Sequence, residues 1–183
     1  MTNSLINFKN SFNGGTRPNR FEVFATWPSA VTSRPGQSFK FKVVSASLPR
    51  AKINTIGIPY RGRTISYAGD RSYEPWIVGI YDDGESASTW RALNQWKEAL
   101  DGHYNHKVVN NDYSYSNLQT TWTVKQLGLN GNILRTINLY KCWPNVIGDI
   151  SLNMGETNFV AFNVSLTFDH MEIVSGLRNG AQL

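Results

Sequence analysis

The sequence predicts a mainly β protein, an antiparallel β-sandwich or barrel with one packed α-helix at about residues 86–101. Short segments with alternating apolar and polar residues recur along the chain, as expected of half-buried strands. One segment has helical spacing, and the strand–helix–strand rhythm of a parallel sheet is missing. With 183 residues, the chain is long enough for one domain that buries about 70% of its unfolded surface.

Residues 1–19 are predicted to form a flexible N-terminal arm. Gly14, Gly15 and Pro18 interrupt regular structure there, and periodic hydrophobicity is weak. Phe8 and Phe12 can dock on a neighbouring molecule, so ordering on assembly is one fate of the arm. The domain itself is assigned to residues 20–172, and residues 173–183 to a loose C-terminal tail.

The first half of the domain carries period-two patterns typical of strands. Strands are expected at residues 21–27, 39–43, 53–58, 63–68 and 73–81, with a Pro- and Gly-containing loop at residues 28–38. The second strand is expected to be half exposed, because Lys40 and Lys42 alternate with Phe39, Phe41 and Val43.

One helix is expected after these strands. Its apolar residues recur at helical spacing: Trp90, Leu93, Trp96 and Leu100. Ser86 or Ser88 can cap its start, and Gly102 can end it. The two tryptophans on one stripe indicate that the helix packs against a sheet.

The second half of the domain begins with a polar loop at residues 102–117. A hairpin follows, in which Asn130–Gly131 predicts a type I′ turn between residues 118–124 and 133–139. A short strand is expected at residues 146–153. The most regular strand pattern is the last one, with Phe162, Val164 and Leu166 on one face.

The charge is unevenly distributed along the chain. Residues up to Arg71 contain 11 Lys or Arg against 2 acids, a net +9, whereas the rest contains 7 against 11, a net −4. A basic half is typical of nucleic-acid binding. It suits equally well an interface in which the basic edge of one copy meets the acidic edge of the next, and scattered surface charge is a third interpretation.

The residues provide no catalytic constellation, which favours a protein that is not an enzyme. Asp82, Asp83 and Glu85 precede the helix, where negative charge stabilises a helix N-terminus. His103 and His106 lack further ligands at metal-binding spacing, so neither a metal nor a cofactor is expected.

The remaining features concern the cysteine and the membrane. Cys142 is the one cysteine, next to Trp143, and is expected to be a buried structural thiol. Apolar runs are too short to span a bilayer, and the N-terminal residues lack the pattern of a signal peptide. No membrane insertion is expected, and the protein is expected in the cytosol when made.

The segment from Ile58 to Trp76, IPYRGRTISYAGDRSYEPW, is the main candidate for a contact element. It combines arginines with tyrosines and a tryptophan, the residue types that anchor protein–protein interfaces. Pro59 and Pro75 are expected to bracket a strand pair or long hairpin. Four charged residues in so short a segment argue against a buried core strand.

This segment, followed by IYDD and WRALNQW, resembles the tail-tube proteins of contractile-tailed, T4-like bacteriophages. The resemblance continues in TVKQLGLNGNILRTINLYKCWPNVIGDISLNM and FVAFNVSLTFDHME, and it covers about residues 19–172 in order. It implies a β-barrel-like subunit that assembles into stacked hexameric rings, a hollow tube for DNA ejection in which neighbouring sheets join.

The resemblance also implies partners and site residues. The partners are further copies of the chain, the tail sheath protein, the tape-measure protein, and baseplate and tail-terminator proteins, with DNA in transit without specific binding. The location is the virion tail, and the host cytoplasm during assembly. The implied subunit or ring interface comprises Tyr60, Arg61, Gly62, Arg63, Asp70 and Arg71.

Two alternatives stay open. Basic residues interleaved with aromatics at residues 39–76 are also typical of a single-stranded nucleic-acid-binding β-barrel. A tube subunit of a phage-derived contractile injection system would carry the same sequence features as a phage tail tube. For a conduit, we expect the basic residues of the first half to lie at subunit contacts and the lumen to be neutral to acidic.

Overall fold

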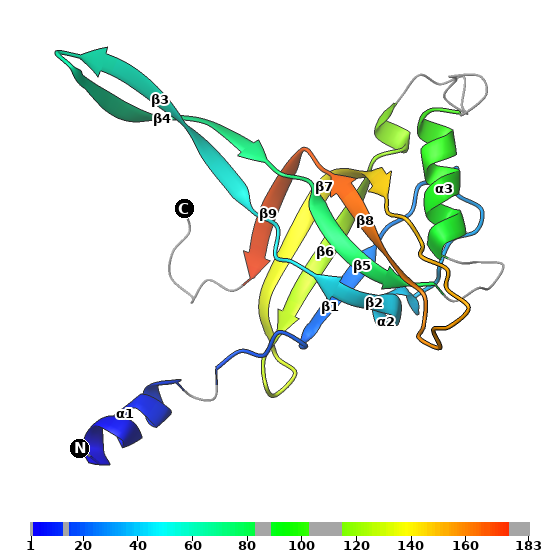
Figure 1. The fold of residues 1–183 in the computed structure, drawn as a ribbon, viewed down its shortest axis with the longest axis horizontal. Helices are drawn as coiled ribbons and strands as arrows, with labels where there is room; N and C mark the ends of the chain where they lie inside the picture. The colour runs from blue at the N-terminus through cyan, green and yellow to red at the C-terminus, as the bar shows by residue number, and fades with distance from the viewer. Residues whose placement is uncertain (1, 13–14, 83–88, 103–114, 176–183) are drawn as a thin grey trace.

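The computed structural model describes residues 2–12, 15–82, 89–102 and 115–175, which form a β-rich domain with two projecting elements (Figure 1). Its helices and strands in chain order are α1 (Thr2–Phe12), β1 (Phe21–Ala25), α2 (Phe39–Lys42), β2 (Val43–Ala46), β3 (Ala51–Tyr60), β4 (Arg63–Tyr73), β5 (Trp76–Tyr81), α3 (Thr89–Leu100), a 3-10 turn (Tyr115–Asn117), β6 (Thr120–Leu127), β7 (Ile133–Ile147), β8 (Ala161–Thr167) and β9 (His170–Ser175).

The body of the domain is an antiparallel sheet in the order β1-β6-β7-β8-β5-β2, with β9 paired to β7 beside that path. Strand β7 is 15 residues long; its first part pairs with β6 and β9 and its last part with β8. Between these parts, Lys141 has φ 57° at a register shift. A bulge of this kind bends a strand, which lets the sheet wrap around its core. The mainly β, antiparallel fold class is therefore confirmed.

Alternating side chains fill the interior of the curved sheet. In β8, Phe162, Val164 and Leu166 are buried as the sequence pattern predicts. Aromatic rings complete the centre, where Trp122 contacts Phe39 at 5.3 Å, Trp27 at 5.8 Å and Trp76 at 6.3 Å between ring centroids. These edge-to-face pairs add to the free energy gained from burial alone.

Helix α3 lies against the sheet, as predicted, and its first expected residues, 86–88, lie outside the described part of the chain (Figure 1). Leu93 and Trp96 are fully buried, and the Trp96 indole donates to the Leu118 carbonyl at 2.7 Å. The expected two-tryptophan stripe is wrong in one respect, because Trp90 is 42% exposed. The buried stripe instead runs through small residues such as Ala92 and Ala99, which let the helix approach closely.

Two turn regions differ from the prediction. Residues 39–42 form helix α2, in which the amides of Phe39 and Phe41 donate to carbonyls three residues earlier. Phe39 is buried, and Phe41 is 77% exposed. The 128–132 connection contains a turn closed by Gly131 N–H to Gly128 O at 3.1 Å. Asn130 has no positive φ, so this turn is not the expected type I′.

Two strand boundaries also differ. The chain forms no strand at residues 148–153, because β7 already provides the partner of β8 and ends at Ile147. The last strand pattern is split at residues 168–169 into β8 and β9, and β9 extends to Ser175. Phe168 remains buried, while Asp169 turns outward and pairs with Lys141 at 3.2 Å.

The N-terminal segment forms helix α1, where the sequence analysis expects a flexible arm. Its apolar residues Leu5, Phe8 and Phe12 are spaced as on one helical face. Figure 1 shows α1 projecting away from the sheet.

Cys142 is fully buried, as expected, and its Sγ lies 3.3 Å from the Leu139 carbonyl. Burial raises the pKa of this thiol from 9.0 to about 12. The thiolate is the reactive form, so burial makes Cys142 far less reactive at pH 8 than an unburied thiol. We expect Cys142 to resist a thiol-reactive dye in the native protein and to react fully in guanidinium, measured by absorbance. Fast labelling of the native protein would contradict this burial.

The raised pKa of Cys142 also makes the free energy of unfolding depend on pH. The folded state retains the thiol proton above pH 9, where the unfolded chain loses it. The contribution of Cys142 is therefore complete below about pH 9 and falls as the pH rises towards 12.

Candidate assembly interface

The Arg-rich segment belongs to a β-hairpin that projects from the barrel (Figure 1). Strands β3 and β4 pair with each other over their whole length and with no other described strand. The hairpin therefore spans residues 51–73, so Pro59 lies near its tip and the two prolines do not bracket it. We call residues 51–73 the projecting hairpin.

The tip of the projecting hairpin is a two-residue turn. Tyr60 pairs with Arg63, and the intervening Arg61 and Gly62 have φ 47° and 78°. Two positive φ values in a two-residue loop are typical of a type I′ turn, whose twist matches the flanking strands. The Arg61 guanidinium lies 5.3 Å from the Tyr60 ring centre. Two arginines and an aromatic ring are thus presented together at the outermost point.

One face of the projecting hairpin is apolar. The cross-strand pairs Ile58–Ile65 and Ile56–Tyr67 lie in register below Tyr60. Their exposed fractions are between 44% and 56%. Since neighbouring residues alternate between faces, these five side chains form one continuous strip, which we call the apolar face: Ile56, Ile58, Tyr60, Ile65 and Tyr67.

The opposite face carries small side chains. Gly57 pairs with Ser66, and Pro59 pairs with Thr64. A Cβ on Gly57 would lie 3.0 Å from the Thr64 methyl group, so the two strands are closely packed here. An exposed two-stranded hairpin is marginally stable in water and is stabilised by packing on a further layer. Its apolar face therefore indicates a binding surface.

The lower part of the hairpin contains a β-bulge. The register shifts between Ile53 and Thr55, opposite Gly69 and Asp70. A Cβ on Gly69 would lie 3.0 Å from the Asn54 carbonyl, which explains the glycine. Asp70 and Arg71 are exposed beside this bulge. They lie several residues from the tip, so the predicted site residues form two groups along one hairpin.

The base of the hairpin is anchored to the barrel. Arg50 and Glu74 form an ion pair just outside the two strands. The Tyr73 ring lies 5.4 Å from Phe168 of the core. Asp70 forms no ion pair with an arginine among the described residues.

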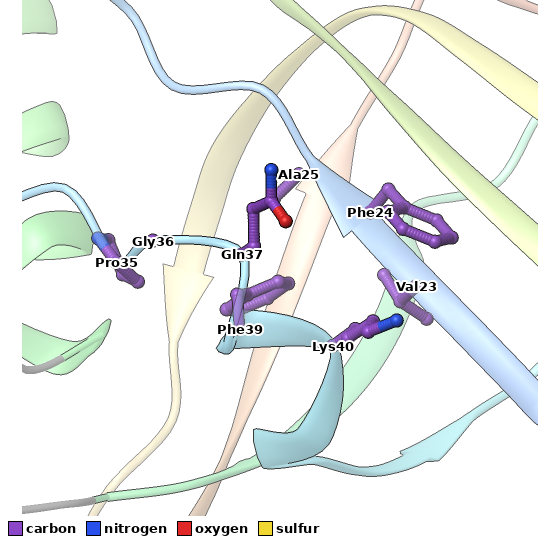
Figure 2. Close-up of a pocket in the computed structure, with 8 residues that line it drawn as sticks. All are labelled: Val23, Phe24, Ala25, Pro35, Gly36, Gln37, Phe39 and Lys40. Atoms are coloured by element: carbon purple, nitrogen blue, oxygen red, sulfur yellow. The ribbon is translucent and has the colours of Figure 1, made fainter.

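A second candidate surface follows the open edge of β1. Strand β1 is the last in its sheet, so one side of it has no strand partner in the described part of the chain. A pocket of about 430 Å³ lies there, formed by residues 23–25, 35–37, 39 and 40. Figure 2 shows the Gln37 side chain extending towards Ala25 above Phe39, with Lys40 beside Val23. Lys40 also lies over the Phe24 ring at 5.8 Å and pairs with Glu22 at 3.7 Å.

Sequence reasoning missed two exposed apolar regions. One is the apolar face itself, whose signal is the isoleucine alternation in β3. The other is the 148–160 segment, where Leu152, Met154 and Phe159 are more than 80% exposed. The 148–160 segment has no such repeating pattern, and polar residues surround its apolar ones.

Clusters of metal-binding residues and membrane-spanning helices are also absent from the described residues. No group of three metal-ligating side chains is present among them. His103 and His106 lie outside these residues, as do Asp83 and Glu85 of the acidic cluster. None of the helices described has the length and apolar character needed to cross a membrane.

Comparison with known proteins places this geometry in a family. A family model described as phage tail tube protein matches residues 16–173. Tail tube protein gp19 of Enterobacteria phage T4 is 25% identical over 158 residues, which cover 85% of this chain and 90% of that protein. The tail tube protein of Serratia phage KSP90 is 22% identical over 145 residues, covering 77% and 78%.

Solved structures show a similar fold. A chain of the PVC sheath–tube complex, an extracellular contractile injection system in its extended state, matches with TM-score 0.57 and 14% identity, covering 91% of this chain and 97% of that one. A chain of the anti-feeding prophage (AFP) tube-terminating cap matches with TM-score 0.58 and 15% identity, covering 88% and 91%. With the family model matching most of its length, this chain belongs to the phage tail tube protein family.

Proposed function

We propose that this chain is the structural subunit of a phage tail tube, which self-assembles into stacked hexameric rings around a hollow conduit for DNA ejection. The observation that carries the proposal is the projecting hairpin, whose apolar face has no covering layer in the described part of the subunit. Family membership supplies the context in which such a hairpin acts.

The apolar face provides free energy for association. Completing the burial of five half-exposed Ile and Tyr side chains contributes about 1 kcal/mol each. The hairpin projects from one side of the barrel, so it meets a different surface of the next copy. Such a head-to-tail contact closes into a ring or continues as a filament.

The sheet edges suit the same arrangement. Strands β1 and β9 run in opposite directions at two edges of the β1-β6-β7-β9 part of the sheet. Continuing this sheet from β9 of one copy to β1 of the next gives an antiparallel pair. Closure of this kind removes the open edges that an isolated sheet must otherwise protect.

Within this arrangement we assign subunit or ring contacts to both groups of hairpin residues. Tyr60, Arg61, Gly62 and Arg63 contact a neighbour through the tip, and Asp70 and Arg71 contact it through the bulge. The basic residues then lie away from the lumen, which stays neutral to acidic so that DNA passes without specific binding. A tube structure with Arg61, Arg63 or Arg71 lining the lumen would contradict this assignment.

The remaining assignments follow from the same proposal. The tube is enclosed by the sheath protein, surrounds the tape-measure protein, and ends at baseplate and tail-terminator proteins. Support comes from the fold match to a chain in a sheath–tube complex. The subunit has a structural and not an enzymatic role, assembles in the host cytoplasm without membrane insertion, and resides in the virion.

Negative-stain electron microscopy with light scattering on the purified protein tests the proposal. Rings or hollow tubes with sixfold symmetry are the expected result. A protein that stays monomeric at all concentrations, also with a baseplate extract as initiator, would contradict it. An oligonucleotide titration at several salt concentrations runs in parallel, since tight salt-dependent binding by the monomer would favour a single-stranded nucleic-acid-binding barrel.

A further inference from the structure

Helix α1 presents an apolar stripe that nothing in the described subunit covers. Leu5, Phe8 and Phe12 are 58%, 63% and 59% exposed. The rings of Phe8 and Phe12 stack at 5.5 Å, so the stripe is preformed. The helix precedes the residues that match the family model, which begin at residue 16.

An 11-residue helix needs a partner surface. Isolated helices shorter than about 12–15 residues are marginal in water and gain their stability from packing of an apolar face. Figure 1 shows α1 projecting beyond the sheet, on the side of the barrel away from α3. The covering surface thus has to come from another molecule or from a rearranged N-terminal segment.

A matching groove lies on the α3 side of the domain. It has a volume of about 620 Å³ and runs between α3 and the 147–160 segment. Trp90 and Leu152 form its apolar walls, with exposed fractions of 42% and 82%. We call it the helix–loop groove. The Trp90 ring does not pack in the core, and in the helix–loop groove it offers an apolar surface to a docked helix.

The charges of the two surfaces are complementary. The first acidic residue of the chain is Glu22, and Lys9 follows Leu5 by four residues, so it borders the apolar stripe of α1. The groove contains Asp82 and Asp149 beside one basic residue, Lys97. The two carboxylates therefore outnumber the one cation in the lining of the groove.

We propose that α1 of one copy docks in the helix–loop groove of a second copy. This inference rests on the proposed self-assembly and names an additional contact within it. Each copy carries both α1 and the helix–loop groove, and the two lie on opposite sides of the domain. One copy can therefore bind a second copy through α1 and a third through its groove. Docking therefore propagates head to tail, in the same sense as the hairpin contact.

Disulfide trapping tests the contact. In the F8C/L152C double variant, docking between copies links the chains into a ladder of dimers, trimers and longer products under mild oxidation. Each single variant yields dimers at most, since it carries one accessible thiol. Cys142 is fully buried and does not interfere. The matched control is F8C/F41C, whose second site is 77% exposed but outside the groove; we expect roughly tenfold fewer linked chains.

The other outcomes are distinguishable on a non-reducing gel. An internally linked monomer of F8C/L152C would show that α1 folds back onto its own groove and would overturn the proposal. Normal tubes with no ladder would place α1 elsewhere and leave the tail-tube proposal intact. A wild-type chain that forms no tubes would overturn both.

Discussion

Replacing Arg63 with glutamate is expected to leave the subunit folded and to abolish tube formation. Arg63 is exposed at the tip of the projecting hairpin, where β3 and β4 pair with no other described strand. Folding of the barrel does not depend on its charge. In a contact with a neighbouring copy, a reversed charge costs about 2–5 kcal/mol, which raises the concentration needed for assembly by at least roughly 30-fold. Sedimentation and electron microscopy measure this loss.

Arg135→Glu is the matched control for this experiment. It makes the same charge change at an exposed position on β7 in the body of the barrel. Circular dichroism and the melting temperature of both variants are expected to equal those of the wild type within a few degrees. Tubes of normal length from Arg63→Glu would contradict the interface assignment. An equal loss of tube formation in both variants would show that net charge, and not the position of Arg63, causes the loss.

Replacing Trp122 with alanine is expected to cost about 3–5 kcal/mol of unfolding free energy. The Trp122 side chain is fully buried and contacts the rings of Trp27, Phe39 and Trp76. Its loss leaves a cavity that three large rings cannot fill without leaving their edge-to-face arrangement. Guanidinium unfolding of the monomer, followed by fluorescence or circular dichroism, measures the change.

Trp90→Ala is the control for the same ring type in a different environment. Trp90 is 42% exposed, so its removal is expected to cost less than about 1 kcal/mol. A loss at Trp90 as large as that at Trp122 would show that the core is not organised around the Trp122 contacts. If Trp90→Ala is stable but forms fewer tubes, the result supports the helix–loop groove as a contact surface.

Several elements could be predicted because local physics determines them. The alternation in residues 160–168 produces β8, whose inward face consists of Phe162, Val164 and Leu166. The helical spacing around Leu93 and Trp96 produces α3. The position of the Arg61–Gly62 turn could be predicted, because strand patterns at residues 53–58 and 63–68 flank it. In each case the pattern repeats often enough to exceed the influence of neighbouring elements.

Other elements were decided by long-range contacts. Residues 39–42 alternate like a strand but form α2, because Phe39 is drawn into the aromatic core beside Trp27 and Trp122. The last strand pattern is interrupted after β8, where the Asp169 amide donates to the Tyr140 carbonyl of β7 at 3.1 Å and the chain returns as β9 alongside β7. The predicted site residues all lie on one hairpin, but their division between tip and bulge depends on a register shift that involves both strands.

The sequence by itself determined the fold class, the family and the segment that carries the candidate interface. These depend on periodicity and on ordered motifs, which are local properties of the chain. Only the tertiary structure decided which apolar side chains remain uncovered: Ile58 and Phe162 belong to equally good strand patterns, yet the first is 50% and the second 3% exposed. Burial depends on whether another layer packs on a strand, and among the described residues no further strand or helix packs on the projecting hairpin.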